Sequence, residues 1–148
     1  MDKKSEIIQK LASIFHENWR ESRAEDGKYK PMIEKSEDNQ WTESHGTNIV
    51  DIANTEFKDL PANWQYENLE AAKVAVDLVF DKVINWEEIT SEMIEGMSKT
   101  VHEKWLERNW IEWSFENQRV DYDHLSEEEK SKDRIQIELA IKIIKSEK

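Results

Sequence analysis

The tetrapeptide His-Glu-x-Trp occurs twice in this chain, at residues 16–19 and 102–105. A His-Glu pair on a helix is typical of zinc hydrolases, in which a second histidine follows four residues after the first and faces the same side. Arg20 and Leu106 occupy those positions here. The two other histidines have no ligand-like spacing. We therefore predict no metal site and no catalytic residues, and we expect that the chain is not an enzyme.

The composition narrows the class of protein further. With 148 residues, 37% of them hydrophobic and 36% charged, the chain can fold as one domain. The absence of cysteine excludes disulfides and thiol catalysis, and a cytoplasmic location is the default expectation. No apolar run is long enough to span a membrane. No glycine-rich phosphate loop or other cofactor motif occurs, so no cofactor is predicted.

The formal charge of −12 bears on partners. Residues 1–84 carry 11 basic and 17 acidic side chains and residues 85–148 carry 10 and 16, so each part contributes −6. A nucleic-acid polymer would be repelled and is not an expected partner. A small phosphorylated ligand is compatible with this charge, because a few arginines in a pocket can override the global field locally.

The apolar spacing and the low glycine and proline content predict a mainly helical, all-α fold. We expect helices over about 3–23, 61–84, 85 or 91 to 105, and 126–143. Residues 24–55 read as loop with one short strand near 48–52, and the insert 32–50 has no predicted role. Trp64 and Trp86 lie beside apolar stripes, so we expect both to pack in the core.

Two helix–loop–helix repeats are predicted, over residues 1–84 and 85–148 of one compact domain. The two His-Glu-x-Trp motifs are 86 residues apart, and "FKDLPANWQYEN" (57–68) aligns with "YDHLSEEEKSKD" (122–133) at an offset of 65. The difference is a longer loop in the first repeat. An internal duplication with pseudo-twofold symmetry is the simplest explanation.

This ordered pattern resembles the ryanodine-receptor repeat, or RyR domain. The residues that carry the resemblance in the first repeat are His16, Glu17, Trp19, Arg23, Gly27, Tyr29, Pro31, Leu60 and Pro61, and in the second they lie in "VHEKWLERN" and "QRVDYDHLSEEEKSKDR". The family implies a helical pair of repeats that occurs in ryanodine receptors and in small prokaryotic or phage proteins. It also implies that an adenine nucleotide can be held between the two equivalent tryptophans.

The resemblance thus gives a set of candidate ligand-binding residues: Trp19, Arg23, Tyr29, Trp105, Asn109 and Arg119. Asn109 stands where the second repeat should carry the arginine, and Arg119 matches only approximately. For the tryptophans, a clamp on a flat ring and simple packing between repeats both remain open. For Arg23, a phosphate contact and a salt bridge remain open, and Tyr29 would either donate to the ligand or pack the loop.

Two functions follow as hypotheses. The first is a non-catalytic module that senses or sequesters a signalling nucleotide, for example as a phage protein that removes an immune messenger. The second is an acidic protein–protein interaction module without a small-molecule ligand. A homo-oligomer is compatible with either.

Overall fold

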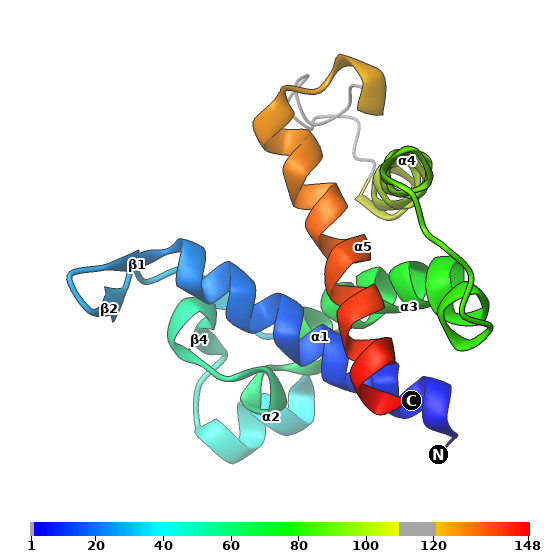
Figure 1. The fold of residues 1–148 in the computed structure, drawn as a ribbon. Helices are drawn as coiled ribbons and strands as arrows, with labels where there is room; N and C mark the ends of the chain where they lie inside the picture. The colour runs from blue at the N-terminus through cyan, green and yellow to red at the C-terminus, as the bar shows by residue number, and fades with distance from the viewer. Residues whose placement is uncertain (1, 110–120) are drawn as a thin grey trace. The chain divides into compact units, whose positions relative to one another are not determined.

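A computed structural model describes residues 2–109 and 121–148 (Figure 1). The described chain is mainly helical, which confirms the predicted class. It divides into two compact units, a first unit of Ile8–Glu70 and a second unit of Met1–Ile7 with Ala71–Lys148. This division by contacts differs from the repeat boundary at residue 84, which stays a prediction.

The first unit begins within α1 (Lys3–Ser22). A hairpin of β1 (Ala24–Glu25) and β2 (Lys28–Tyr29) follows and extends beyond the end of α1 (Figure 1). The turn between its strands needs positive φ at Asp26 and Gly27, which glycine adopts without steric cost. The hairpin ends just before the predicted insert.

The insert folds into regular structure rather than open loop. It contains β3 (Ile33–Lys35), α2 (Asn39–His45) and β4 (Ile49–Asp51), with β3 and β4 paired antiparallel. The short strand near 48–52 is confirmed, but the expectation of loop at α2 was wrong. The Asp38 side chain accepts the Trp41 N–H at 3.2 Å and so caps this helix, and Gly46 ends it in the left-handed conformation.

Two short 3-10 turns, η1 (Ile52–Asn54) and η2 (Phe57–Asp59), lead into α3 (Ala62–Ile84). Pro61 directly precedes α3, as predicted for a residue that cannot donate to a helix. The second unit takes over within α3 and continues with α4 (Ser91–Asn109), η4 (Tyr122–His124) and α5 (Glu127–Glu147). In Figure 1, α4 is seen nearly end-on beside α5, and these two helices pack against each other more extensively than any other pair of described elements.

Of the predicted starts of α4 and α5, the one for α5 agrees with the structure and the earlier alternative for α4 does not. Ser126 accepts the Glu129 N–H at 3.2 Å, which confirms the predicted cap of α5. The alternative start of α4 at Asn85 was wrong, because residues 85–90 are not helical and α4 begins at Ser91.

The segments aligned at the 65-residue offset have the same local structure. Phe57 and Tyr122 are buried and each opens a 3-10 turn that closes on Leu60 or Leu125, whose N–H returns to the Phe57 or Tyr122 carbonyl at 3.1 and 3.0 Å. The three aligned pairs that follow are all buried in their helices: Ala72 with Ile137, Ala75 with Ala140, and Val79 with Ile144. The duplication itself and the pseudo-twofold relation remain predictions.

Candidate functional site

The side chains of the first His-Glu-x-Trp motif are fixed by both stacking and hydrogen bonding. On α1, the rings of His16 and Trp19 stack with centroids 5.7 Å apart and 23° between their planes. His16 is buried, and its Nε2 lies 2.7 Å from the Thr55 carbonyl oxygen. Because a carbonyl only accepts, Nε2 must be the protonated nitrogen. Burial lowers the pKa of His16, so the ring is neutral at pH 7.

Arg23 lies one turn after Trp19, with its guanidinium carbon 5.2 Å from the indole centroid. Its Nε and Nη2 donate to the carbonyls of Lys30 and Pro31, each at 3.1 Å. The guanidinium therefore holds the loop after the hairpin against the end of α1. The salt bridge that the sequence left open for Arg23 is replaced by these two carbonyl contacts.

Tyr29 of β2 and Arg20 of α1 form a second cluster near the end of α1. The Arg20 guanidinium lies 4.5 Å from the Tyr29 ring centroid and its Nε donates to the Ala53 carbonyl at 2.9 Å. The Tyr29 hydroxyl donates to Glu21 at 2.6 Å, which raises the pKa of Tyr29. A ligand that used this hydroxyl would have to replace Glu21.

A cavity of about 220 Å³ opens beside Trp19. Its lining comes from α1, from the insert, from the turns η1 and η2 and from the start of α3, all within the first unit: His16, Trp19, Met32, Ile52, Leu60, Trp64, Glu67 and Asn68. Trp64 is held by a hydrogen bond from its Nε1 to the Lys35 carbonyl at 2.9 Å. The walls are therefore largely apolar, and both indoles are held in place before any ligand arrives.

The cavity residues of α3 were not predicted as site residues. Trp64 and Asn68 are four residues apart, so they share one face of the helix that starts after Leu60-Pro61. That spacing was visible in the sequence. Met32 and Ile52 could not be found this way, because they reach the cavity through the fold of the insert.

The second motif places Trp105 beside His102, with centroids 6.1 Å apart and 12° between planes. Here the His102 Nδ1 faces a carboxylate, that of Asp133 on α5, at 3.5 Å. His102 is buried and Asp133 is partly buried, and desolvation raises the pKa of Asp133 to about 6. Asn109 donates its side-chain amide to the Trp105 carbonyl at 3.0 Å. Arg119 lies outside the described residues.

One tryptophan contradicts its prediction. Trp86 is 83% exposed, so the expectation that it packs in the core was wrong. The apolar stripe of α3 ends at Val83, and the chain turns out of the helix before the indole.

Two features are absent from the described residues. No group of three or more His, Asp or Glu that could hold a metal ion occurs in residues 2–109 and 121–148. None of the helices in this part of the chain is long and apolar enough to cross a membrane.

Comparisons of the chain with protein-family models, with curated proteins and with solved structures gave no match. The resemblance to the RyR repeat therefore rests on the quoted residues and stays a prediction.

Proposed function

We propose that this protein is a non-catalytic module that binds a small molecule carrying a flat ring, such as an adenine nucleotide, and that the ring enters the cavity beside Trp19. The observation that carries the proposal is the pair of fixed indoles, Trp19 and Trp64, in one apolar cavity. Stacking of a base on an aromatic side chain contributes about 1–3 kcal/mol.

The volume limits which part of a ligand is enclosed. Cavities for drug-sized ligands usually measure about 300–1,000 Å³, and this one measures about 220 Å³. It suits a ring rather than a whole nucleotide, so the sugar and phosphates would lie outside. A phosphate at Arg23 would compete with the carbonyls of Lys30 and Pro31.

Asn68 can make the cavity selective for one kind of ring. In the described part of the chain its side-chain amide has no hydrogen-bond partner, and it lines the cavity. A side-chain amide can donate and accept at once, which matches the N6 donor and N7 acceptor of adenine, whereas the corresponding edge of guanine presents two acceptors. We therefore expect adenine to bind more tightly than guanine.

Calorimetric titration with linear and cyclic adenine nucleotides, and with guanine nucleotides for comparison, tests the proposal. Trp19→Ala should weaken binding by about tenfold to a hundredfold, and Asn68→Leu should reduce the preference for adenine. Tyr66→Ala removes an exposed aromatic ring of α3 that does not line the cavity, and it serves as the matched control. Unchanged affinity in Trp19→Ala would refute the site.

Trp105 is a separate question in the same experiment. If Trp105 contacts the second face of the ring, as the resemblance predicts, Trp105→Ala will weaken binding as much as Trp19→Ala does. If only Trp19 binds the ring, Trp105→Ala will keep the wild-type affinity. Arg119→Ala and Asn109→Ala test the remaining candidates in the same way.

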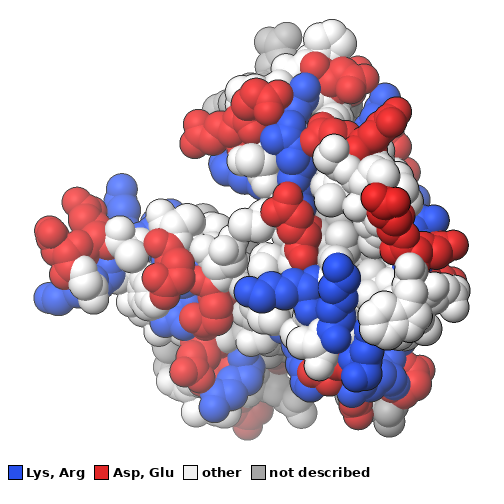
Figure 2. All heavy atoms as spheres, in the orientation of Figure 1, with Lys and Arg blue, Asp and Glu red and all other residues white. Residues whose placement is uncertain are grey.

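The biological role would be to sense or to sequester the nucleotide, which suits the predicted cytoplasmic location. The alternative, an acidic protein-interaction module, draws on the charge of −12. On the face drawn in Figure 2, however, acidic and basic side chains are interspersed rather than gathered by sign. Such a module would bind a basic protein in a salt-sensitive way and would gain no thermal stability from any nucleotide.

A further inference from the structure

Trp86 occupies a backbone position that favours glycine. It lies just after the end of α3, its N–H donates to the Val83 carbonyl at 3.1 Å, and the Glu87 N–H donates to the Lys82 carbonyl at 2.9 Å. These two bonds form a Schellman motif, whose left-handed residue is usually Gly or Asn. Trp86 has φ of +59°. A bulky side chain is strained there.

Besides the backbone strain, the exposure of the indole to solvent is unfavourable. At 83% exposed, Trp86 gains little from burial in the described structure. Backbone strain and an exposed aromatic ring at one position indicate a function that the isolated chain does not fulfil.

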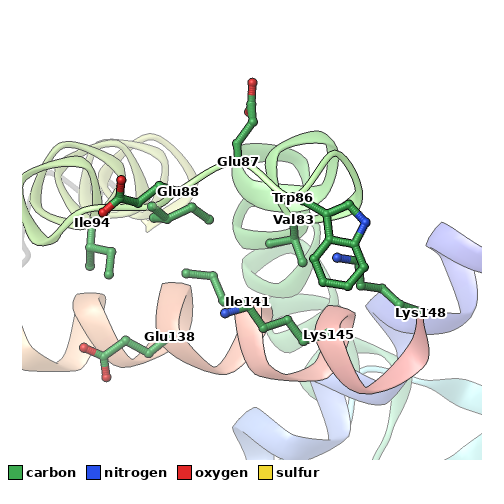
Figure 3. Close-up of a pocket in the computed structure, with 10 residues that line it drawn as sticks. Val83, Trp86, Glu87, Glu88, Ile94, Glu138, Ile141, Lys145 and Lys148 are labelled. Carbon is green, nitrogen blue, oxygen red and sulfur yellow. The ribbon is translucent and has the colours of Figure 1, made fainter.

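Trp86 forms the lip of an open groove of about 930 Å³ in the second unit. Figure 3 shows Val83 and Ile141 between the two ends of this groove. Glu88 and Glu138 lie at the end near Ile94, and the side chain of Lys148 lies at the indole. The Lys148 ammonium is 3.0 Å from an indole ring centroid. The groove is thus apolar in the middle and oppositely charged at its ends.

The charged wall of the groove comes from one face of α5. Glu138, Ile141 and Lys145 follow the three-and-four spacing of a helical stripe, and Lys148 continues it. Within residues 2–109 and 121–148, neither Glu138 nor Lys145 has an ion-pair partner in its own chain. Read along the helix, the stripe is acidic, then apolar, then basic.

We infer that this groove is the surface through which two copies of the chain pair. A stripe that runs from acidic to basic is complementary to itself when a second copy lies antiparallel to it, which is the arrangement that a twofold axis perpendicular to α5 produces. An axis near Ile141 brings Glu138 opposite the partner's Lys145, and Lys145 opposite the partner's Glu138. The same rotation carries the indole of Trp86 to the Ile94 end of the partner's groove, where burial offsets its exposure.

Sedimentation equilibrium over a range of protein concentrations tests this directly. The wild-type protein should form a reversible dimer. Glu138→Lys and Lys145→Glu should each weaken it about tenfold or more, because each places like charges opposite one another twice. Lys142→Glu, which makes the same charge change outside the groove lining, is the matched control and should dimerise as the wild type does.

Mixing the Glu138→Lys and Lys145→Glu variants identifies the partner as a second copy. A mixed pair has two lysines in the stripe of one chain and two glutamates in the stripe of the other. Every reversed charge then meets its opposite, and both ion pairs form again. We expect the equimolar mixture to recover dimerisation that neither variant shows alone. Failure to recover would overturn the antiparallel arrangement.

The variant Trp86→Gly separates the effect of the strained backbone from the role of the indole in pairing. Glycine relieves the left-handed backbone, so at concentrations where the wild type is monomeric the variant should melt at the higher temperature. At higher concentrations the variant should lack the dimer. A wild-type protein that is monomeric up to about 1 mM, the range of very weak association, would refute the proposal. So would a Trp86→Gly variant that dimerises as well as the wild type.

Discussion

The two His-Glu-x-Trp motifs share one local geometry but lie in different surroundings. In both, a buried histidine stacks on the tryptophan three residues later. His16 is within hydrogen-bond distance of a backbone carbonyl, whereas His102 faces the Asp133 carboxylate. The helix dictates the stacked pair, because residues three apart are neighbours on its surface. What the histidine meets depends on segments distant in sequence.

The two tryptophans also differ in what lies beside them. Trp19 adjoins a cavity and lies beside the Arg23 guanidinium. At the equivalent place in the second motif, Asn109 bonds the backbone of its own helix. The same tetrapeptide therefore lies beside a cavity in the first unit and beside a carboxylate with a raised pKa in the second. The following experiments sharpen or break this comparison.

The largest effect is expected from the aligned core positions, where the first predicted repeat has Ala72 and the second has Ile137. Both are fully buried. Ile137→Ala should leave a cavity and lower the free energy of unfolding by about 2–5 kcal/mol. The reverse change, Ala72→Ile, should overfill its site and cost about 1–3 kcal/mol. Urea unfolding measures both, and a loss below about 1 kcal/mol for Ile137→Ala would contradict the packing seen at this position.

The next effect is the pH dependence that Asp133 confers on the second unit. Burial raises its pKa from 3.8 to about 6, so between these values the folded protein binds a proton that the unfolded chain does not. Stability contributed by this group therefore falls as the pH rises from about 4 to 6, by on the order of 2–3 kcal/mol. Asp133→Asn should remove this slope in unfolding curves recorded across the interval.

For His16 we expect the opposite dependence of stability on pH. Its pKa is lowered in the folded state, so the unfolded chain protonates first as the pH falls below 6.5, and stability is lost on acidification. His16→Gln should abolish that loss, whatever its effect on stability at pH 8. If both variants changed the slope in the same direction, the contrast between the two motifs would be wrong.

The smallest effect concerns the arginine that only the first motif has. Arg23→Asn copies the second motif and removes the indole contact and both carbonyl bonds, so we expect a loss of about 1 kcal/mol in thermal or urea unfolding. Arg23→Lys keeps the charge but not the planar fork, and should recover less than half of it. Full recovery by lysine would show that charge alone matters.

The long helices could be predicted from sequence because their signals are local. Apolar residues recur along α1 and α3, Ser126 caps α5, and Pro61 directly precedes α3. The helix in the insert was missed although Asp38 and Gly46 mark its ends. Its exposed polar surface leaves no buried face, and the periodic signal depends on such a face.

By itself the sequence determined the mainly helical class and the two motifs that place a histidine beside a tryptophan, because helical spacing alone brings such residues together. Only the tertiary structure decided what surrounds them. The insert brings Met32 and Ile52 to the Trp19 cavity, α5 brings Asp133 to His102, and the turn after α3 leaves Trp86 exposed. Each of these depends on how the chain turns between elements, and helical periodicity carries no information about those turns.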